Sequence, residues 1–320
     1  MCKGVIFVSK KKRIIYAVIG TLVTVVIISV VLAVIVSINK PDVIQLSDSD
    51  SDTEIIEATV KTATEEGMSI PLEDLQPEIE DVINEVKKSV GGEWSVYIVI
   101  PKTGDVLSIN QKKMQAASVI KLCVMCKAYE EYDELKKEYS DYYDVDELMK
   151  DMIVISDNEA ADTIIKMLGR GDYKEGLRKV NEFCKENGLT NTVMGRLMSM
   201  EDNVNDNYTT SEDMGKLMHM IYEGEFDHSK EMLHLLGKQD RKLKIPAGVP
   251  ANVRTANKTG ELEDVQNDVA IVYTKYPYII SVMADGVSDY QIPIDAVVDI
   301  SRVTYDYIFE KEEEATWTIE

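Results

Sequence analysis

The chain has 320 residues, 45% of them hydrophobic and 29% charged, which is the composition of a globular protein with a sizeable core. Its formal net charge is −22. Because residues 1–40 hold six basic and no acidic residues, residues 41–320 hold 29 basic and 57 acidic ones, a charge of −28. The negative charge of residues 41–320 excludes nucleic acid as a partner, since nucleic-acid binding depends on neutralising phosphates.

The first predicted element is a transmembrane helix at residues 14–38. These 25 residues carry no charge and are rich in Val and Ile, and they are long enough to cross about 30 Å of hydrocarbon. The run exceeds the roughly 7–15 apolar residues of a cleaved signal peptide, which favours an uncleaved anchor. The basic cluster at 10–13 predicts that residues 1–13 form a cytoplasmic tail and that the rest of the chain lies outside.

Residues 39–73 are predicted to be an acidic flexible linker, because segments such as the Ser-Asp repeat at 47–52 cannot bury a core. Residues 74–320 form the predicted folded domain. Its order of elements predicts an α+β fold, in which both ends of the domain build one sheet around an inserted helical block. The predicted elements are a helix at 75–90, strands at 94–100 and 106–110, helices and loops from 118 to 237, strands at 265–274 and 278–284, and a helix at 292–309.

The chain has four cysteines, Cys2, Cys123, Cys126 and Cys184. The C-x-x-C spacing of Cys123 and Cys126 is compatible with redox chemistry or a metal. Both fall in a segment that reads as an apolar helix, which favours buried structural thiols. A disulfide from one of them to Cys184 stays open.

A first chemical motif, S-x-x-K, is formed by Ser118 and Lys121. On a helix these positions share one face, so the Lys121 ammonium can approach the Ser118 hydroxyl, which needs an adjacent base to become nucleophilic. A chance match is common, and a second copy at 9–12 lies in the predicted cytoplasmic tail.

Two further motifs follow in the chain. Ser156-Asp157-Asn158 follows an apolar stretch and opens a predicted helix, so it also reads as an N-cap. The K-T-G at 258–260 precedes a predicted strand and also reads as a β-turn. A second K-T-G at 102–104 lies between two predicted strands, upstream of Ser118, and is interpreted as a hairpin turn.

The motifs S-x-x-K, S-D-N and K-T-G, in this order, resemble the signature of class A β-lactamases and penicillin-binding proteins. The resemblance spans residues 74–310 and includes the Ala-Ala before Ser118 and the run at 267–272. It implies an antiparallel sheet flanked by helices, with an inserted all-helical subdomain.

The resemblance also implies catalytic roles. Ser118 attacks an amide or β-lactam carbonyl and becomes acylated, while Lys121 assists removal of its proton. Ser156 relays a proton to the departing nitrogen, and Lys258 supports that relay.

Four substrate-binding residues are implied in the same way. Asn158 hydrogen-bonds the substrate's side-chain amide, and Thr259 binds the substrate carboxylate within the K-T-G motif that Gly260 completes. Glu261 contributes its backbone N–H, together with that of Ser118, to an oxyanion hole.

Release of the acyl group would depend on a base. The run from Arg196 to Asn205 resembles the class A pattern R-L-x-x-x-E-x-x-L-N, with Val204 in place of Leu. This implies Glu201 as the base that activates water and Asn205 as the residue that holds it. Two features depart from the pattern: the loop after it is several residues shorter, and Ser199 stands where the Arg of an Arg–Asp clasp is expected.

Three functions follow from the resemblance: a β-lactamase-like hydrolase, a penicillin-binding D,D-carboxypeptidase or transpeptidase, and a slowly turned-over β-lactam sensor. The expected substrate is a β-lactam or a D-Ala-D-Ala-type peptide. The expected location is the bacterial cell membrane, with the catalytic domain on the outside. The three histidines form no tight ligand motif, so no metal and no other cofactor is predicted.

Overall fold

The computed structural model describes residues 69–200 and 205–317. The chain divides into two units, residues 1–66 and 67–320, and all the described residues belong to the second. The predicted tail, the predicted anchor at 14–38 and most of the predicted linker therefore lie outside the described residues. Among the residues that are described, no helix is both long and apolar enough to cross a membrane.

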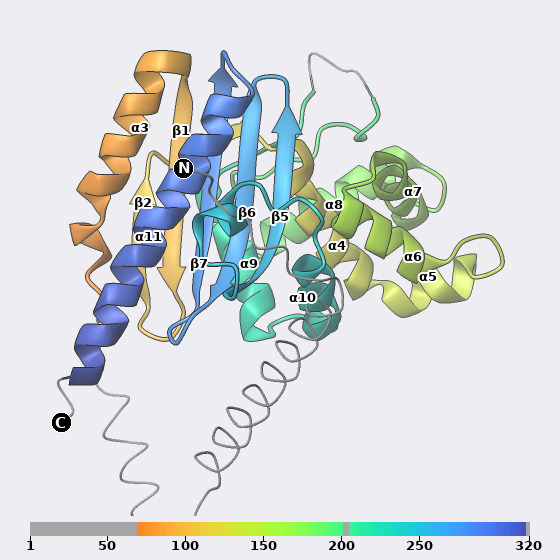
Figure 1. Ribbon diagram of the computed structural model, residues 1–320. Coiled ribbons are helices and arrows are strands. Elements are labelled where there is room, and N and C mark those ends of the chain that lie inside the picture. The colour runs from red at the N-terminus through yellow and green to blue at the C-terminus, as the bar shows by residue number, and fades with distance from the viewer. Residues whose placement is uncertain (1–68, 201–204, 318–320) are drawn as a thin grey trace, which may run out of the picture. The chain divides into compact units, whose positions relative to one another are not determined.

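A five-stranded antiparallel sheet forms the centre of this unit (Figure 1). The order β2-β1-β7-β6-β5 places strands from both ends of the sequence side by side, which confirms the predicted α+β arrangement. The strands are β1 (Gly91–Ile100), β2 (Asp105–Ile109), β5 (Arg254–Leu262), β6 (Val265–Tyr273) and β7 (Tyr278–Val287).

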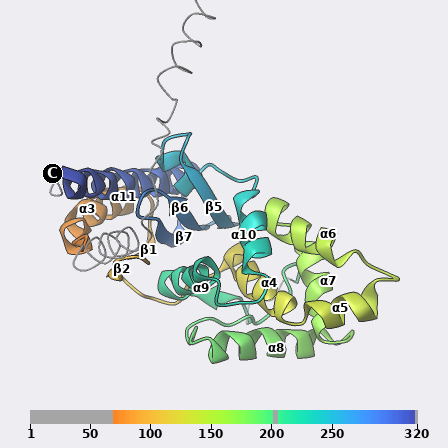
Figure 2. The same ribbon diagram turned by 90° about the horizontal axis from the view of Figure 1, so that it is seen from below.

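Two helices, α3 (Gln76–Val90) and α11 (Gln291–Trp317), cover one face of the sheet (Figures 1 and 2). The apolar residues of α3 recur at helical spacing and are buried, as Ile79, Ile83 and Val86 show. They pack against alternate residues of the strands to form one of two cores. Ile70 and Leu72 also belong to this core, so the folded unit begins a few residues before position 74.

The helical block covers the opposite face, as the view from below shows (Figure 2). Its first helix, α4, lies at the centre of the second core, and its residues from Lys121 to Cys126 are all buried. The helices of the block are α4 (Lys121–Glu130), α5 (Tyr132–Tyr139), α6 (Val145–Lys150), α7 (Asn158–Leu168), α8 (Tyr173–Glu186), α9 (Ser211–Glu223) and α10 (Ser229–Gly237).

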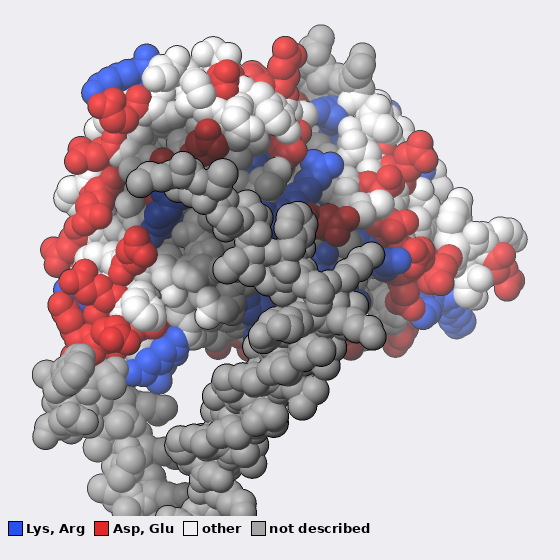
Figure 3. Space-filling model, viewed as in Figure 1, with Lys and Arg blue, Asp and Glu red and all other residues white. Residues whose placement is uncertain are grey.

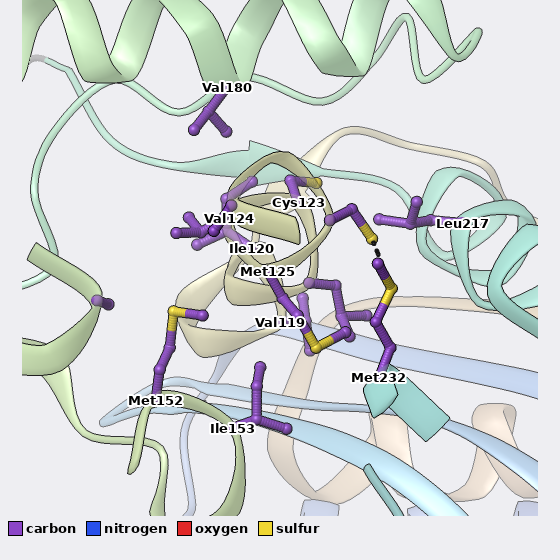
Figure 4. Close-up of a cluster of buried hydrophobic side chains, with 14 of the residues drawn as sticks. Val119, Ile120, Cys123, Val124, Met125, Met152, Ile153, Val180, Leu217 and Met232 are labelled. Carbon is purple, nitrogen blue, oxygen red and sulfur yellow. Dashed lines mark hydrogen bonds between the residues drawn. The ribbon is translucent and has the colours of Figure 1, made fainter. Parts of the chain in front are cut away.

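Figure 4 shows the apolar side chains that surround α4. Cys123, Cys126 and Cys184 are all buried and free, which confirms the interpretation as structural thiols, whereas Cys2 lies outside the described residues. The Cys126 Sγ lies 3.9 Å from the Met232 Sδ. Burial holds the pKa of Cys126 well above its ordinary value, so this thiol stays protonated and unreactive.

The acidic side chains lie largely on outer surfaces. Figure 3 shows them along the side where α3 and α11 lie. Glu85 of α3 and Asp295 and Asp299 of α11 are examples that line a shallow groove between the two helices. The negative charge expected from composition is therefore solvated.

The strand β5 was not predicted, and the K-T-G motif lies inside it rather than in a turn. Its sequence, RTANKTGEL, is polar and lacks the alternation of apolar residues that predicts a strand. By contrast, the K-T-G at 102–104 is the predicted hairpin turn, in which Gly104 has a φ of +77° and donates to the Ile100 carbonyl at 2.8 Å. Two short strands, β3 (Met114–Gln115) and β4 (Tyr208–Thr209), pair beside the helical block.

Helices α7 and α8 pack so closely that their contact requires a glycine. A Cβ on Gly176 of α8 would lie 1.9 Å from the Ile165 carbonyl oxygen of α7. We expect Gly176→Ala to lower the free energy of unfolding of residues 67–320 by about 1–3 kcal/mol, because the two backbones must separate. Urea denaturation measures this. Gly237→Ala is the matched control: a Cβ there meets nothing within 4 Å, so its free energy of unfolding should not fall. Equal values for the two variants would contradict the prediction.

Candidate active site

Ser118 lies in a short 3-10 helix, Ala117–Ile120, that leads directly into α4. It is partly buried, whereas Val119 and Ile120 are fully buried in the core below it. The preceding residue, Ala117, has a φ of +47°, a conformation that costs a residue with a Cβ on the order of 1 kcal/mol. The backbone thus takes this conformation between the buried Ala116 and the partly buried Ser118.

The segment before Ser118 is held by two asparagines. The Asn267 amide donates to the carbonyls of Gln115 at 2.9 Å and Ala116 at 3.1 Å. On the other side, the Ala116 N–H donates to the Asn207 carbonyl at 2.8 Å. These contacts fix the strained backbone at Ala117, and no sequence motif predicted a role for either asparagine.

Lys121 is fully buried, and its ammonium has three partners. Nζ donates to the Ser156 carbonyl at 2.6 Å, the Asn158 Oδ1 at 2.7 Å and the Ser156 Oγ at 3.3 Å. Burial lowers the pKa of Lys121 to about 8, although the negative charge of Asp157 opposes that shift. A substantial fraction of Lys121 is therefore neutral slightly above pH 7, which an exposed lysine would not be.

The S-D-N motif combines two functions. Ser156 has a φ of +62° at the end of a π-helical turn, Asp151–Ile155, and this left-handed conformation turns its side chain toward Lys121. Asp157 is the N-cap of α7, and its Oδ1 accepts from the Ala160 N–H at 2.7 Å. The N-cap interpretation is thus right for Asp157, while Ser156 and Asn158 both contact Lys121.

Lys258 reaches the same hydroxyl from the sheet. Its Nζ donates to the Ser156 Oγ at 2.8 Å and to the Thr259 carbonyl at 2.8 Å. Complete burial, together with the charges of Lys121 and Arg241, holds the pKa of Lys258 well below its ordinary value. With two ammonium groups donating to it, the Ser156 Oγ has both lone pairs engaged, so its own proton is free to be donated elsewhere.

Gly260 allows β5 to lie against the nucleophile segment. A Cβ at this position would lie 2.8 Å from the Ala116 carbonyl and 3.2 Å from the Ser118 backbone nitrogen. Glycine therefore permits a close approach between the backbones of β5 and Ser118, and Glu261 follows on the same strand. The two N–H groups expected to form an oxyanion hole thus belong to segments in direct contact.

Thr259 points to the other face of the strand from Lys258 and Gly260, because side chains alternate along a strand. It pairs across the sheet with Asp268, whereas Lys258 pairs with Val269. Its Oγ1 is buried and has no hydrogen-bond partner among the described residues.

Of the two residues predicted to serve deacylation, the structure describes Asn205 but not Glu201. Glu201 lies in 201–204, outside the described residues. Asn205 is exposed and lines a cavity of about 740 Å³ with Arg196, Met200 and residues of α8.

Ser199 takes no part in an Arg–Asp clasp, as expected, but an arginine elsewhere in the loop forms an Arg–Asp pair. Arg196 Nε pairs with Asp206 Oδ1 at 2.9 Å, and Arg196 Nη1 donates to the Met200 carbonyl at 2.8 Å. Ser199, where the Arg was sought, is instead bound through its N–H and its hydroxyl to the carboxylate of Asp162. A clasp exists, but the arginine stands three residues before the expected position.

Asp162 is a residue that sequence reasoning missed. It lies on α7 one turn after Asn158, and its carboxylate accepts the N–H groups of Met198 at 2.6 Å and Ser199 at 3.1 Å. The i, i+4 spacing from Asn158 was the available signal, because it places both side chains on the same face of the helix. Asp162 thus ties the loop to the helix that carries Asn158.

The comparisons with known proteins agree with this architecture. A model of the beta-lactamase enzyme family matches residues 74–137 and 133–308. Among solved structures, a beta-lactamase from Sphaerobacter thermophilus is 23% identical with a TM-score of 0.62, over 71% of this chain and 95% of that chain. PBP-A is 24% identical with a TM-score of 0.64, over 75% and 97%. A beta lactamase from Xanthomonas campestris is 18% identical with a TM-score of 0.63, over 75% and 100%. No curated protein matches.

The lowered pKa of Lys121 predicts how the reactivity of Ser118 depends on pH. We expect the rate at which an activated acyl ester acylates Ser118 to rise with pH, with a midpoint near pH 8, because Lys121 accepts a proton only after losing its own. Stopped-flow kinetics across pH 6–10 would measure this. Lys121→Ala should lower the rate by about 10²–10⁴ and remove the midpoint. A rate that falls as pH rises through 8 would exclude Lys121 as the base.

Proposed function

Because the chain belongs to the beta-lactamase enzyme family, we propose that it is a serine hydrolase that opens β-lactam rings through an acyl-enzyme on Ser118. The observation that carries the proposal is the convergence of Lys121 and Lys258 on the hydroxyl of Ser156. This arrangement supplies a base of lowered pKa and a hydroxyl with a free proton, and both are required to break an amide bond.

Acylation proceeds in three proton transfers. Neutral Lys121 takes the proton of Ser118 as the Oγ attacks the carbonyl carbon, and the backbone N–H groups of Ser118 and Glu261 stabilise the oxyanion. The C–N bond then breaks as Ser156 gives its proton to the departing nitrogen. Lys121, now protonated, returns a proton to Ser156 along the existing 3.3 Å contact. Losing one oxyanion donor typically costs about 10²–10³ in rate.

Hydrolysis of the acyl-enzyme requires a base for water, and we assign this role to Glu201, with Asn205 helping to hold the water. Two contacts support this assignment. The Arg196–Asp206 ion pair closes the loop, and Asp162 ties it to α7, so the chain is held on both sides of 201–204. Catalysis by a general base requires that the base be positioned accurately relative to the acyl group.

A penicillin-binding enzyme acting on D-Ala-D-Ala-type peptides is the second candidate. The likeness of the fold to PBP-A favours it, and so does the short loop after Asn205, which departs from the class A pattern. Such an enzyme would be acylated by β-lactams and release them slowly. A sensor would behave in the same way but show no peptidase activity.

We further propose that residues 14–38 anchor the chain in the bacterial membrane, with residues 67–320 outside the cell. The length and apolar character of that segment support the location, as does the basic cluster at 10–13.

A labelled penicillin tests the acyl-enzyme. We expect the full-length chain to form a covalent adduct at Ser118, identified by mass spectrometry, and Ser118→Ala to form none, because it removes the proposed nucleophile. Ser9→Ala, in the second S-x-x-K, is the matched control and should be labelled like the unmodified chain. Labelling of intact cells by a penicillin that does not enter the cytoplasm checks the proposed location. An adduct that survives Ser118→Ala would refute the assignment.

The lifetime of the adduct separates hydrolase from penicillin-binding protein. Glu201→Gln should leave the acylation rate unchanged and lengthen the adduct lifetime by about 10²–10⁴, because only deacylation loses its base. Time-resolved mass spectrometry after a penicillin pulse measures both steps. Glu263→Gln serves as control, since it removes a carboxylate outside this loop. An unchanged lifetime in Glu201→Gln would exclude Glu201 as the base and favour the penicillin-binding alternative.

A further inference from the structure

The side chain of Glu261 makes contacts that the oxyanion role of its backbone does not require. Its Oε2 pairs with Arg241 Nη1 at 2.9 Å and accepts from the Tyr290 hydroxyl at 3.2 Å. Its Oε1 pairs with Lys244 Nζ at 3.1 Å. Two cations and a hydroxyl therefore hold this carboxylate at the end of β5.

Lys244 is the more deeply placed of the two cations. Its side chain is 1% exposed, compared with 19% for Glu261 and 47% for Arg241. Its remaining donors reach the carbonyls of Asn267 at 3.1 Å and Gly260 at 3.4 Å. Burial acts to raise the pKa of Glu261, but Lys244 and Arg241 together hold it below its ordinary value. Glu261 is thus ionised at neutral pH and pairs with both cations.

Other charged groups on this side of the sheet leave little positive charge in excess. Asp268 of β6 is buried and accepts from the Ile245 N–H at 3.0 Å and from Asn257 Nδ2 at 3.0 Å. Burial raises the pKa of Asp268 to about 6, so it is mostly negative at pH 7. Lys242 bonds the same Asn257 through Oδ1 at 2.9 Å. Arg241, Lys242 and Lys244 are therefore already opposed by two carboxylates of the chain.

The carboxylate of Glu261 lies on the strand face that carries Thr259. The two residues are two positions apart on β5, so their side chains share a face. The buried Thr259 Oγ1 lacks a hydrogen-bond partner among the described residues. The family resemblance assigns Thr259 to a substrate carboxylate, but here a carboxylate of the protein already occupies the neighbouring cations.

We propose that Glu261 is a specificity determinant that takes the place of a substrate carboxylate on Arg241 and Lys244. The site then favours amides and lactams whose leaving-group side is uncharged, such as an ester or a primary amide, over those with a free carboxylate there. A substrate carboxylate would have to displace Glu261 from its ion pairs or remain without a cation, and like charges at close range disfavour binding. This inference rests on the proposed acylation of Ser118.

Benzylpenicillin and its methyl ester test the inference, because they differ only in this carboxylate. The measurement is the second-order rate constant for acylation of Ser118 in the full-length chain purified in detergent, followed by mass spectrometry. Each constant is divided by the rate of alkaline hydrolysis of the same compound, which removes the difference in intrinsic reactivity. We expect the unmodified chain to prefer the ester. A preference for the acid would overturn the inference without any variant being needed.

Two variants separate this role from a purely structural one. Glu261→Gln removes the charge and keeps the shape, so it should raise the ratio of the acid rate constant to the ester rate constant at least about tenfold. Glu261→Asp keeps the charge and should keep the preference for the ester. If Glu261 served only to neutralise Lys244, Glu261→Gln would change both rates by the same factor, and the inference would fail while acylation persisted. If neither compound acylated Ser118 in any form of the chain, the proposed function itself would fail, and the inference with it.

Discussion

The structure of the site depends on the burial of two ammonium groups against one hydroxyl. Lys121 from α4 and Lys258 from β5 both lie within 3.3 Å of the Ser156 Oγ. Removing two like charges from water costs several kcal/mol per ion unless hydrogen bonds replace the lost solvation. The carbonyls of Ser156 and Thr259 and the Asn158 amide oxygen provide those bonds. These bonds do not fully replace the lost solvation, so the pKa of both lysines is lowered. Each lysine therefore gives up its proton more readily than an exposed lysine does.

That convergence requires the sheet and the helical block to approach more closely than ordinary side chains allow. Gly260 removes the Cβ that would meet the Ala116 carbonyl, and Ala117 adopts a positive φ so that Ser118 faces the junction. Asn267, which lies beside Gly260 across the strand pair, holds the strained segment by its carbonyls. Strands β5 and β6 thus supply both the ammonium of Lys258 and the backbone contacts that position Ser118. The distances within the site are therefore set by the sheet rather than by a loop.

Much of this could be predicted from the sequence, for identifiable reasons. Helix α3 and strands β1, β6 and β7 carry apolar periodicity, which the two cores confirm. The order of three short motifs identified Ser118, Lys121, Ser156 and Lys258 before their contacts were known. Strand β5 was missed because its polar side chains serve the site instead of a core. The Arg196–Asp206 clasp was missed because family spacing placed the arginine at 199, and no local pattern reports an ion pair across a loop. The ion pairs of Glu261 depend on two residues nearly twenty positions upstream, so they follow from tertiary structure alone.

The three buried thiols have a consequence for how residues 67–320 reach and keep their structure. No disulfide closes a loop among Cys123, Cys126 and Cys184, so the unfolded chain is not shortened by any cross-link between them. Stability must then come from packing, including the core around α4. Each thiol becomes reactive only when the core opens. The rate at which a thiol reagent modifies them therefore reports the opening of the helical block from the sheet, independently of any substrate.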